Sequence, residues 1–330
     1  MWITSSLETI KTPTVIALGN FDGVHRGHQR VIEPVAVAAR VGLPVLAGAV
    51  HGVSSETGSF GTDAAPIPTV VTFYPHPQEF FTGQRRLLLT PISEKAQYLQ
   101  TLGIEQLVLL PFDWALANLT PQEFVEQILV ERLQARWISV GQDFRFGRKR
   151  AGTIADLQQI AAQYGIPVEV ASLHLHQGER ISSSAIRQAL SQGDLDRANQ
   201  LLGRPYTLVG EVIAGKQLGR TIGFPTANLQ LPDDKFLPCC GVYSVWAKSA
   251  ELGQQPGVMN IGYRPTVDGQ QISVEVHLLD WSGDLYGQTL TVSLEQFLRP
   301  EQKFASLDDL KAQIQRDAEQ ARLGLAAQQV

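Results

Sequence analysis

The pattern in which apolar runs alternate with other segments changes near residue 203, and this change constrains the fold more than any other feature of the chain. Before it, short apolar runs alternate with amphipathic stretches, which predicts a parallel sheet covered by helices. After it, apolar runs are separated by turns rich in Gly and Pro, which predicts a small antiparallel barrel. At 330 residues the chain is also too long for one typical core. We therefore predict an α/β domain over residues 1–203, and a β-barrel with a C-terminal helix over residues 204–330.

The pattern also predicts individual elements. The expected strands are residues 15–18, 69–73, 106–110, 137–140 and 168–173 in the first domain, and 206–213, 241–248, 272–279 and 288–294 in the second. Thr120, Pro121 and Glu123 indicate a helix start with a capping box. Ser306 and Asp309 indicate the start of the last helix. Its apolar stripe is expected at Leu307, Leu310, Ile314 and Ala318.

Composition excludes several classes of protein. A formal net charge of -5 gives no reason to expect nucleic-acid binding. No signal peptide and no apolar run near the ~20 residues of a membrane span are evident, so we expect a cytoplasmic protein. Cys239 and Cys240 are adjacent, which favours small buried side chains over a disulfide. Residues 48–68, rich in Gly, Ser, Thr and Ala, are expected to form a mobile surface loop.

The first strand leads directly into a glycine-framed segment, residues 19–28, that precedes a helix. Glycines let backbone N–H groups approach an anion, and the helix contributes its positive end. His25 and His28 are three residues apart, so they can face one ligand and donate to phosphate oxygens. Taken alone, the pair also fits chance or half of a zinc site. Zinc needs further ligands, and nothing ties His174 and His176 to this pair.

This segment resembles the signature of the bacterial bifunctional riboflavin kinase/FAD synthetase family, whose first domain is a Rossmann-like His-x-Gly-His nucleotidyltransferase. The resemblance continues through residues 72–77, 141–147 and 181–187, in the same order. It implies that His25 and His28 stabilise the ATP phosphates during adenylyl transfer. The other ATP contacts that we expect are Gly19, Asn20, Asp22, Gly23, Gly27, Ser182, Ser183, Ser184 and Arg187. Weaker flavin contacts are expected at Phe73 and Asp143.

The residues leave other interpretations open. The three serines precede a helical pattern, where they and Arg187 can bind an anion or form an ordinary N-cap. Asp143 can support magnesium or flavin, or cap a loop. Ser184 stands where the family usually has threonine, which keeps a hydroxyl. Pro34 falls inside the helix that begins near His28, where proline normally kinks or ends a helix.

The second half contains a false phosphate-binding loop. Residues 210–217 almost match the P-loop, but Gln217 lacks the magnesium-binding hydroxyl of that motif. Residues 219–228 instead resemble the Pro-Thr-Ala-Asn signature of riboflavin kinases. The resemblance implies that Thr226 and Asn228 serve the metal and the nucleotide. Their spacing places them on the same side of an extended segment. Nearby ATP contacts are expected at Gly215, Gly219 and Thr221.

Glu275 has two interpretations. Alternation along residues 272–278 places it opposite the apolar side chains, where a carboxylate is usually a surface charge. The resemblance to riboflavin kinases, which includes residues 241–243, 259–262, 285–287 and 297–300, instead implies the catalytic base. The riboflavin 5'-hydroxyl is protonated at neutral pH and gains from a carboxylate within reach. Glu295 is the rival base, and Arg299 is a weaker candidate for a flavin contact.

The sequence therefore predicts an enzyme that phosphorylates riboflavin to FMN and adenylylates FMN to FAD, using ATP and Mg²⁺. Riboflavin, FMN, FAD and ATP are the expected partners, with no nucleic acid and no membrane. The alternative is a cytidylyltransferase-like enzyme fused to a flavin-sensing barrel. Thr226, Asn228 and Glu275 together argue against it, because sensing requires neither a metal ligand nor a base.

Overall fold

The computed structural model describes residues 1–41, 64–172, 175–176, 178–215, 219, 222–266 and 269–327. The chain forms two compact units, Met1–Arg86 with Ile92–Ile181, and Leu87–Pro91 with Ser182–Val330. The boundary near residue 203 stays a prediction. Most of residues 48–68, expected as a mobile loop, lies outside the described residues, as do His174, Gln217 and Thr221. Ile67 and Pro68 already belong to a strand, so the expected loop ends too late.

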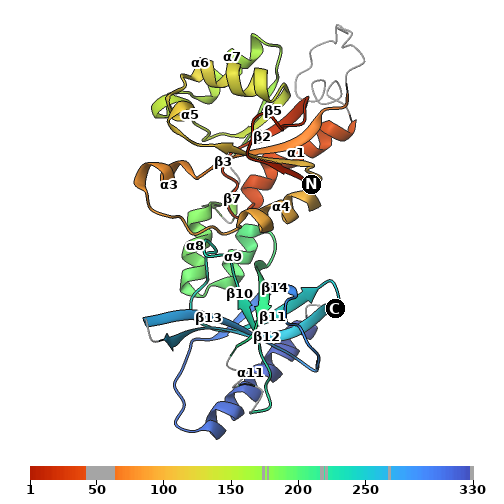
Figure 1. The fold of residues 1–330 in the computed structure, drawn as a ribbon, viewed down its shortest axis with the longest axis vertical. Helices are drawn as coiled ribbons and strands as arrows, with labels where there is room; N and C mark the ends of the chain where they lie inside the picture. Colours follow the sequence, from red (N-terminus) through yellow and green to blue (C-terminus); the bar gives the residue numbers. More distant parts are fainter. Residues whose placement is uncertain are drawn as a thin grey trace. The chain divides into compact units, whose positions relative to one another are not determined.

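The first unit contains a sheet with helices packed on it (Figure 1). The sheet is parallel, with the strand order β1-β4-β3-β2-β5-β6. Its strands are β1 (Trp2–Thr4), β2 (Thr14–Leu18), β3 (Ile67–Tyr74), β4 (Gln106–Pro111), β5 (Ala135–Gly141) and β6 (Val168–Ala171). The parallel sheet is confirmed, and only the edge strand β1 was not expected. β2 lies between β3 and β5, which is the point where the strand order reverses. Ligands of such sheets bind beyond the carboxyl ends of the strands at this point.

Helices cover both faces of the sheet, as predicted. Ile16 and Leu18 of β2 enter one core, with side chains from η1 and α7, while Val15 and Ala17 enter the other, with side chains from α1 and α4. The helices are α1 (Arg26–Val41), α3 (Pro77–Thr82), α4 (Ile92–Thr101), α5 (Trp114–Asn118), α6 (Pro121–Glu123), the π-helix η1 (Phe124–Arg132), the 3-10 turn η2 (Arg148–Arg150) and α7 (Ile154–Ala162). A hairpin of β7 (Leu175–His176) and β8 (Glu179–Arg180) completes the described part of this unit.

Two local predictions had different outcomes. The capping box is confirmed, because Thr120 Oγ1 accepts from the Glu123 N–H and the Glu123 carboxylate accepts from the Thr120 N–H. Pro34, in contrast, does not end its helix, and α1 continues to Val41. Val31, Ile32 and Val35 are buried around it, so packing of the apolar face offsets the lost backbone hydrogen bond.

The second unit is built on strands accompanied by the helix α11 (Leu307–Ala327) (Figure 1). The strands form a closed antiparallel barrel with the order β10-β13-β12-β11-β14-β9. Its strands are β9 (Tyr206–Ile213), β10 (Ala227–Gln230), β11 (Gly241–Ser249), β12 (Gly253–Thr266), β13 (Gly269–Leu278) and β14 (Thr289–Arg299). The barrel is confirmed, although β10 and β12 were not expected. Helices α8 (Ser183–Gln192), α9 (Leu195–Leu202) and α11 (Leu307–Ala327) belong to the same unit.

The last helix begins as predicted but packs through a later part of its length. The Asp309 N–H donates to Ser306 Oγ over 3.1 Å. Leu307 is 54% exposed, so the expected stripe is wrong at its first residue. The packed face includes Ala318, as predicted, and continues through Ala321 and Leu325, because these later turns are the ones that lie against the barrel.

The segment Leu87–Pro91 lies far from the rest of its unit in sequence but is firmly bound to it. The Lys235 ammonium donates to the Leu89 carbonyl over 2.8 Å, and Leu88 and Phe236 are joined by a backbone hydrogen bond of 2.8 Å. Leu89 is fully buried. Elsewhere in this unit, Cys239 and Cys240 are half-buried free thiols. Among the described residues of the whole chain, no helix combines the length and apolarity that a membrane span requires.

Candidate active sites

The turn between β2 and α1 is held in a strained conformation. Its backbone φ is positive at Phe21 (47°), Gly23 (88°) and Val24 (40°). A left-handed φ costs a non-glycine residue about 1 kcal/mol or more, and it persists where the surroundings over-determine it. The side chains of Phe21 and Val24 are both fully buried, so core packing fixes the turn. The segment predicted to bind phosphate is therefore anchored at the carboxyl end of a central strand.

His25 and His28 lie together in the first turn of α1, as their spacing predicts. Their rings are stacked, with centroids 3.5 Å apart and 13° between the planes. The His28 N–H donates to His25 Nδ1 over 3.2 Å, so a neutral His25 carries its proton on Nε2, where it can donate. A Cβ on Gly27 would lie 3.3 Å from the His25 ring, which explains the glycine between the two histidines.

The remaining residues of the turn differ in exposure. Asn20 is exposed, and its carbonyl accepts from Lys95 Nζ over 3.0 Å and from Thr72 Oγ1 over 3.1 Å. Asp22 is only 3% exposed. Gly19 is tied to β3, because its N–H donates to the Val71 carbonyl. Lys95 and Thr72 were not identified from the sequence, where neither residue type marks a contact with this turn.

β5 ends beside β2, so the segment after it reaches the same crevice of the sheet. There the Asp143 carboxylate forms an ion pair with the Arg180 guanidinium, and both side chains are about half exposed. A group that we call the aromatic cluster follows the carboxyl ends of the neighbouring strands β3 and β4. It consists of Phe73, Phe80, Phe81, Phe112 and Trp114, which make edge-to-face contacts. Phe81 and Trp114 are 59% and 64% exposed, so the cluster offers aromatic surface to a ligand.

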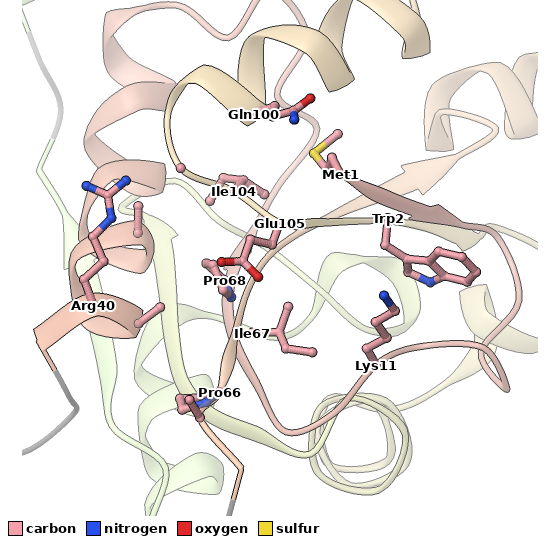
Figure 2. Close-up of a pocket in the computed structure, with 14 residues that line it drawn as sticks. Met1, Trp2, Lys11, Arg40, Pro66, Ile67, Pro68, Gln100, Ile104 and Glu105 are labelled. Atoms are coloured by element: carbon pink, nitrogen blue, oxygen red, sulfur yellow. The ribbon is translucent and has the colours of Figure 1, made fainter.

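A cavity of about 590 Å³ lies at the opposite, amino-terminal ends of the strands (Figure 2). Trp2, Ile67 and Glu105 line it, together with Lys11 and Arg40. None of the predicted site residues contributes to its wall. The predicted site residues of this unit lie instead near the carboxyl ends of the strands.

Ser182, Ser183, Ser184 and Arg187 belong to the second unit. Ser182 is the N-cap of α8, since its Oγ accepts from the Ala185 N–H over 3.2 Å. Arg187 donates to the carbonyls of Ser183 and Leu87 over 3.3 and 3.0 Å. The N-cap interpretation is thus confirmed for Ser182. The contacts of this segment with the ATP triphosphate stay a prediction.

The barrel brings together Thr226, Asn228 and Glu275. Thr226 Oγ1 donates to Glu275 Oε2 over 3.0 Å. Glu275 on β13 is paired in register with Asn228 of β10 on one side and Asn260 of β12 on the other. Its neighbours Val274 and Val276 are buried in the core, so the predicted alternation is confirmed. Glu275 is half-buried in a polar group and is not an ordinary surface charge.

Two glycines close this group from the other side. A Cβ on Gly215 would lie 2.2 Å from Asn228 Nδ2, and a Cβ on Gly219 would lie 2.3 Å from the Phe224 carbonyl oxygen and 3.5 Å from Thr226 Oγ1. The backbone therefore approaches the Asn228 side chain closely at Gly215 and the Phe224 carbonyl closely at Gly219. His277, which sequence reasoning did not identify, donates from Nδ1 to the Pro225 carbonyl over 2.8 Å and fixes the same segment.

Comparisons with known proteins agree with this division into two sites. The sequence model of the family described as FAD synthetase matches residues 7–47 and 60–185, and that described as riboflavin kinase matches residues 202–325. The bifunctional riboflavin kinase/FMN adenylyltransferase of Escherichia coli strain K12 is 41% identical over 310 residues, or 93% of this chain and 91% of that protein. The chain belongs to the bifunctional riboflavin kinase/FMN adenylyltransferase family.

Other members support the assignment. The enzymes so named in Pseudomonas fluorescens and Bacillus subtilis strain 168 are 40% and 36% identical, each over 93% of this chain and over 92% and 91% of their own. A solved structure described as a macrolide-efflux protein from Streptococcus pneumoniae matches 97% of this chain and 98% of its own, with 30% identity and a TM-score of 0.81. That name differs from the family name. We use this likeness for the fold, because the family models and the named enzymes agree on the chemistry.

The two remaining candidates of the riboflavin kinase half have structural explanations of their own. Glu295 is an extra residue in a β-bulge of β14, where burial raises the pKa of its carboxyl. Arg299 donates from Nε and Nη2 to the Asp317 carboxylate of α11 over 2.7–3.0 Å. The Asp317 side chain is 4% exposed. This ion pair fastens the last helix to the barrel. The predicted contact of Arg299 with flavin stays a prediction.

Proposed function

We propose that this chain makes FAD from riboflavin in two ATP-dependent steps, phosphorylation at the Glu275 group and AMP transfer at the His25 and His28 turn. The observation that supports the first step is the Thr226–Glu275 hydrogen bond beside two close-approaching glycines. The second is supported by the stacked histidines at the point where the strand order reverses. Riboflavin, FMN, FAD and ATP are then its partners. A net charge of -5 supports leaving out nucleic acid. The membrane-free, cytoplasmic setting expected from the sequence stays a prediction.

In the kinase step, the riboflavin 5'-oxygen attacks the γ-phosphorus of ATP, and the bond from that phosphorus to the bridging oxygen of ADP breaks. Glu275 accepts the hydroxyl proton, which a carboxylate within hydrogen-bond reach does at neutral pH. FMN and ADP are the products. Asn228 and Asn260 flank Glu275 in register and hold it between the two strands.

Thr226 and Asn228 fit the magnesium ion that this step requires. Their hydroxyl and amide oxygens are hard ligands of the kind Mg²⁺ prefers. A hydroxyl has two lone pairs and one proton, so Thr226 can donate to Glu275 and still offer a lone pair to a cation. We propose that both residues hold Mg²⁺ together with the ATP phosphates. Bound Mg²⁺ supplies neutralisation of the charge on the transferred phosphoryl group.

In the adenylyl step, a phosphate oxygen of FMN attacks the α-phosphorus of ATP, and the bond to the β,γ-pyrophosphate breaks. The second pKa of a phosphate monoester is about 6, so the attacking group is mostly dianionic at neutral pH and requires no base. His25 and His28 donate to the phosphate oxygens as charge develops. The N-terminus of α1 and the backbone of Gly19, Asn20, Gly23 and Gly27 contribute further donors. Asp22 is a further proposed ATP contact of this turn.

The flavin ring of FMN is proposed to lie against the aromatic cluster. Phe73 anchors the cluster to β3, while Phe81 and Trp114 present exposed rings on which an isoalloxazine can stack. Asp143, on the other side of β2, is a polar contact for the same substrate, once its ion pair with Arg180 opens or shares a hydrogen bond. This location also explains why so many aromatic rings remain unburied.

Chromatography of one reaction tests the proposal against the alternative. Purified protein incubated with riboflavin, ATP and Mg²⁺ should first form FMN and then FAD. A cytidylyltransferase-like enzyme with a flavin-sensing barrel would bind riboflavin and form neither product. FMN that accumulates without FAD would show that the kinase assignment holds and the adenylyltransferase assignment does not.

A further inference from the structure

Lys95 is a buried lysine that the two-step reaction does not yet use. It lies on α4, 75 residues after the turn that it contacts, and its side chain is 5% exposed. Its ammonium donates to the Asn20 carbonyl over 3.0 Å. The same carbonyl accepts from Thr72 Oγ1 of β3 over 3.1 Å. Both lone pairs of this carbonyl oxygen are therefore occupied by side chains from two different elements.

The electrostatic environment of Lys95 disfavours its charged form. Burial lowers the pKa of the Lys95 ammonium, and the nearby Asp22 carboxylate only partly offsets that effect. Glu94, the preceding residue of α4, is also buried, while His25 and His28 belong to the same turn as Asp22. A buried pair of opposite charges is weak evidence of a contribution to stability, because apolar residues in both places often stabilise a fold equally well. Fold stability alone therefore does not account for a lysine at this position.

The contact leads directly to the catalytic histidines. Asn20 precedes Phe21, whose backbone φ is strained at 47° and whose ring meets the His28 ring edge-on at 5.4 Å. A shift of the Asn20 carbonyl is thus transmitted through one residue to the imidazole that faces the phosphates. A displacement of about 1 Å in a reacting geometry can cost about 10²-fold in rate.

We propose that Lys95 is a positioning residue for AMP transfer: together with Thr72 it clamps the Asn20 carbonyl and so sets the placement of His25 and His28. The inference rests on the proposed adenylyl step of this unit. It assigns Lys95 no contact with ATP, since its ammonium is directed at the backbone of the turn. The proposal also makes Thr72 a positioning residue, because its uncharged hydroxyl donates to the same Asn20 carbonyl.

Lys95→Met tests the proposal, because it keeps the length of the side chain and removes the ammonium. With FMN and ATP supplied directly, kcat for FAD formation should fall about 10²-fold. The KM for ATP should change much less. The thermal midpoint should fall, because the buried Asp22 carboxylate loses a nearby positive charge, so kcat is measured well below that midpoint and expressed per folded protein. Thr72→Val should lower the same kcat in the same direction, although it changes no charge. FMN formation from riboflavin should stay at the wild-type rate in both variants.

Lys235→Met is the matched control, since Lys235 is also buried and also donates to a backbone carbonyl, that of Leu89 in the other unit. It should leave kcat for FAD formation within about threefold of wild type. The proposal is overturned if Lys95→Met keeps a kcat within threefold, if it loses activity only in proportion to the folded fraction, or if Lys235→Met loses as much. His28→Ala, measured in the same assay, distinguishes failure of the proposed adenylyl step from failure of the Lys95 clamp. A wild-type chain that makes no FAD contradicts the adenylyl step itself, whereas loss in His28→Ala without loss in Lys95→Met contradicts only the clamp.

Discussion

The Thr226 hydroxyl donates to the Glu275 carboxylate over 3.0 Å, across the seam between the Pro-Thr-Ala-Asn segment and strand β13. A threonine at a proposed metal position and a glutamate at a proposed base position are thus hydrogen-bonded to each other. The hydrogen bond orients the carboxylate and, in turn, the hydroxyl lone pairs.

Glu275→Ala should lower kinase turnover by about 10²- to 10⁴-fold, the usual contribution of a general base. With FMN supplied directly, the same variant should make FAD at close to the wild-type rate, because the FMN phosphate requires no deprotonation. Both rates are measured by chromatography of the products. Loss of FAD synthesis from FMN as well would contradict the model of two separate sites.

Glu295→Ala is the control for this prediction. Glu295 lies in a β-bulge of β14, which pairs with β11 and β9 and not with the strand of Glu275. Glu295→Ala should therefore leave kinase turnover close to wild type. If Glu295→Ala loses the kinase while Glu275→Ala keeps it, the wrong carboxylate has been assigned.

His28→Ala should reduce FAD formation by about 10²- to 10³-fold, as for the loss of one oxyanion-type donor. His25 keeps its place in this variant, since the helix start that holds it is made by backbone hydrogen bonds. FMN formation from riboflavin should be almost unchanged. Wild-type adenylylation by a correctly folded His28→Ala protein is the result that would refute the role.

Gly215→Ala should disable the kinase and spare the adenylyltransferase. The added Cβ would lie 2.2 Å from Asn228 Nδ2, so Asn228 must leave its place beside Glu275. A displacement of about 1 Å in a reacting geometry can cost about 10²-fold in rate, so kinase turnover should fall by about that factor. Steady-state rates at saturating Mg²⁺ and ATP measure it. Normal phosphorylation by this variant would show that the position of Asn228 is unimportant.

Asp317→Asn should destabilise the second unit by about 3 kcal/mol, because it leaves the Arg299 guanidinium without its buried counter-charge. The urea midpoint for loss of kinase activity reports this change. Asp280→Asn is the matched control, since the Arg322–Asp280 pair joins the same helix to the barrel but is solvent-exposed. Asn also tolerates the positive φ of 55° at position 280. The urea midpoint of Asp280→Asn should stay close to wild type. Equal midpoint shifts in the two variants would contradict the role assigned to the buried Arg299–Asp317 pair.

The sequence was sufficient for elements with a clean apolar period. Strand β9, predicted at residues 206–213, has these bounds in the structure, and the alternation around Glu275 is confirmed. Strand β12 could not be predicted, because Pro256, Gly257, Gly262 and Pro265 interrupt its pattern. These residues are tolerated because both neighbouring strands, β11 and β13, fix the register of β12. Here tertiary pairing overrides local preference.

The candidate sites show the same limit. His25 and His28 were predicted from a short glycine-framed motif with a chemical reason, whereas Thr226 and Glu275 were predicted from the resemblance to riboflavin kinases. Lys95, Thr72 and His277 act on the backbone of those motifs from elements distant in sequence, and a lysine in a helix normally indicates solvent. No local pattern reports which carbonyl a side chain will reach. Residues that support a motif are therefore visible only after the chain has folded.

The strand-like segment Leu87–Pro91 has a consequence for how such a bifunctional protein can be divided. The chain passes between its two units three times, after residues 86, 91 and 181. A gene split at any single codon, or a protease that cuts one bond, therefore leaves at least one unit lacking a piece encoded with the other. Leu89, which fills a fully buried place beside Lys235, would be the missing piece of the kinase unit. Evolution toward two independent enzymes would need a replacement for this segment, and not only a new start codon.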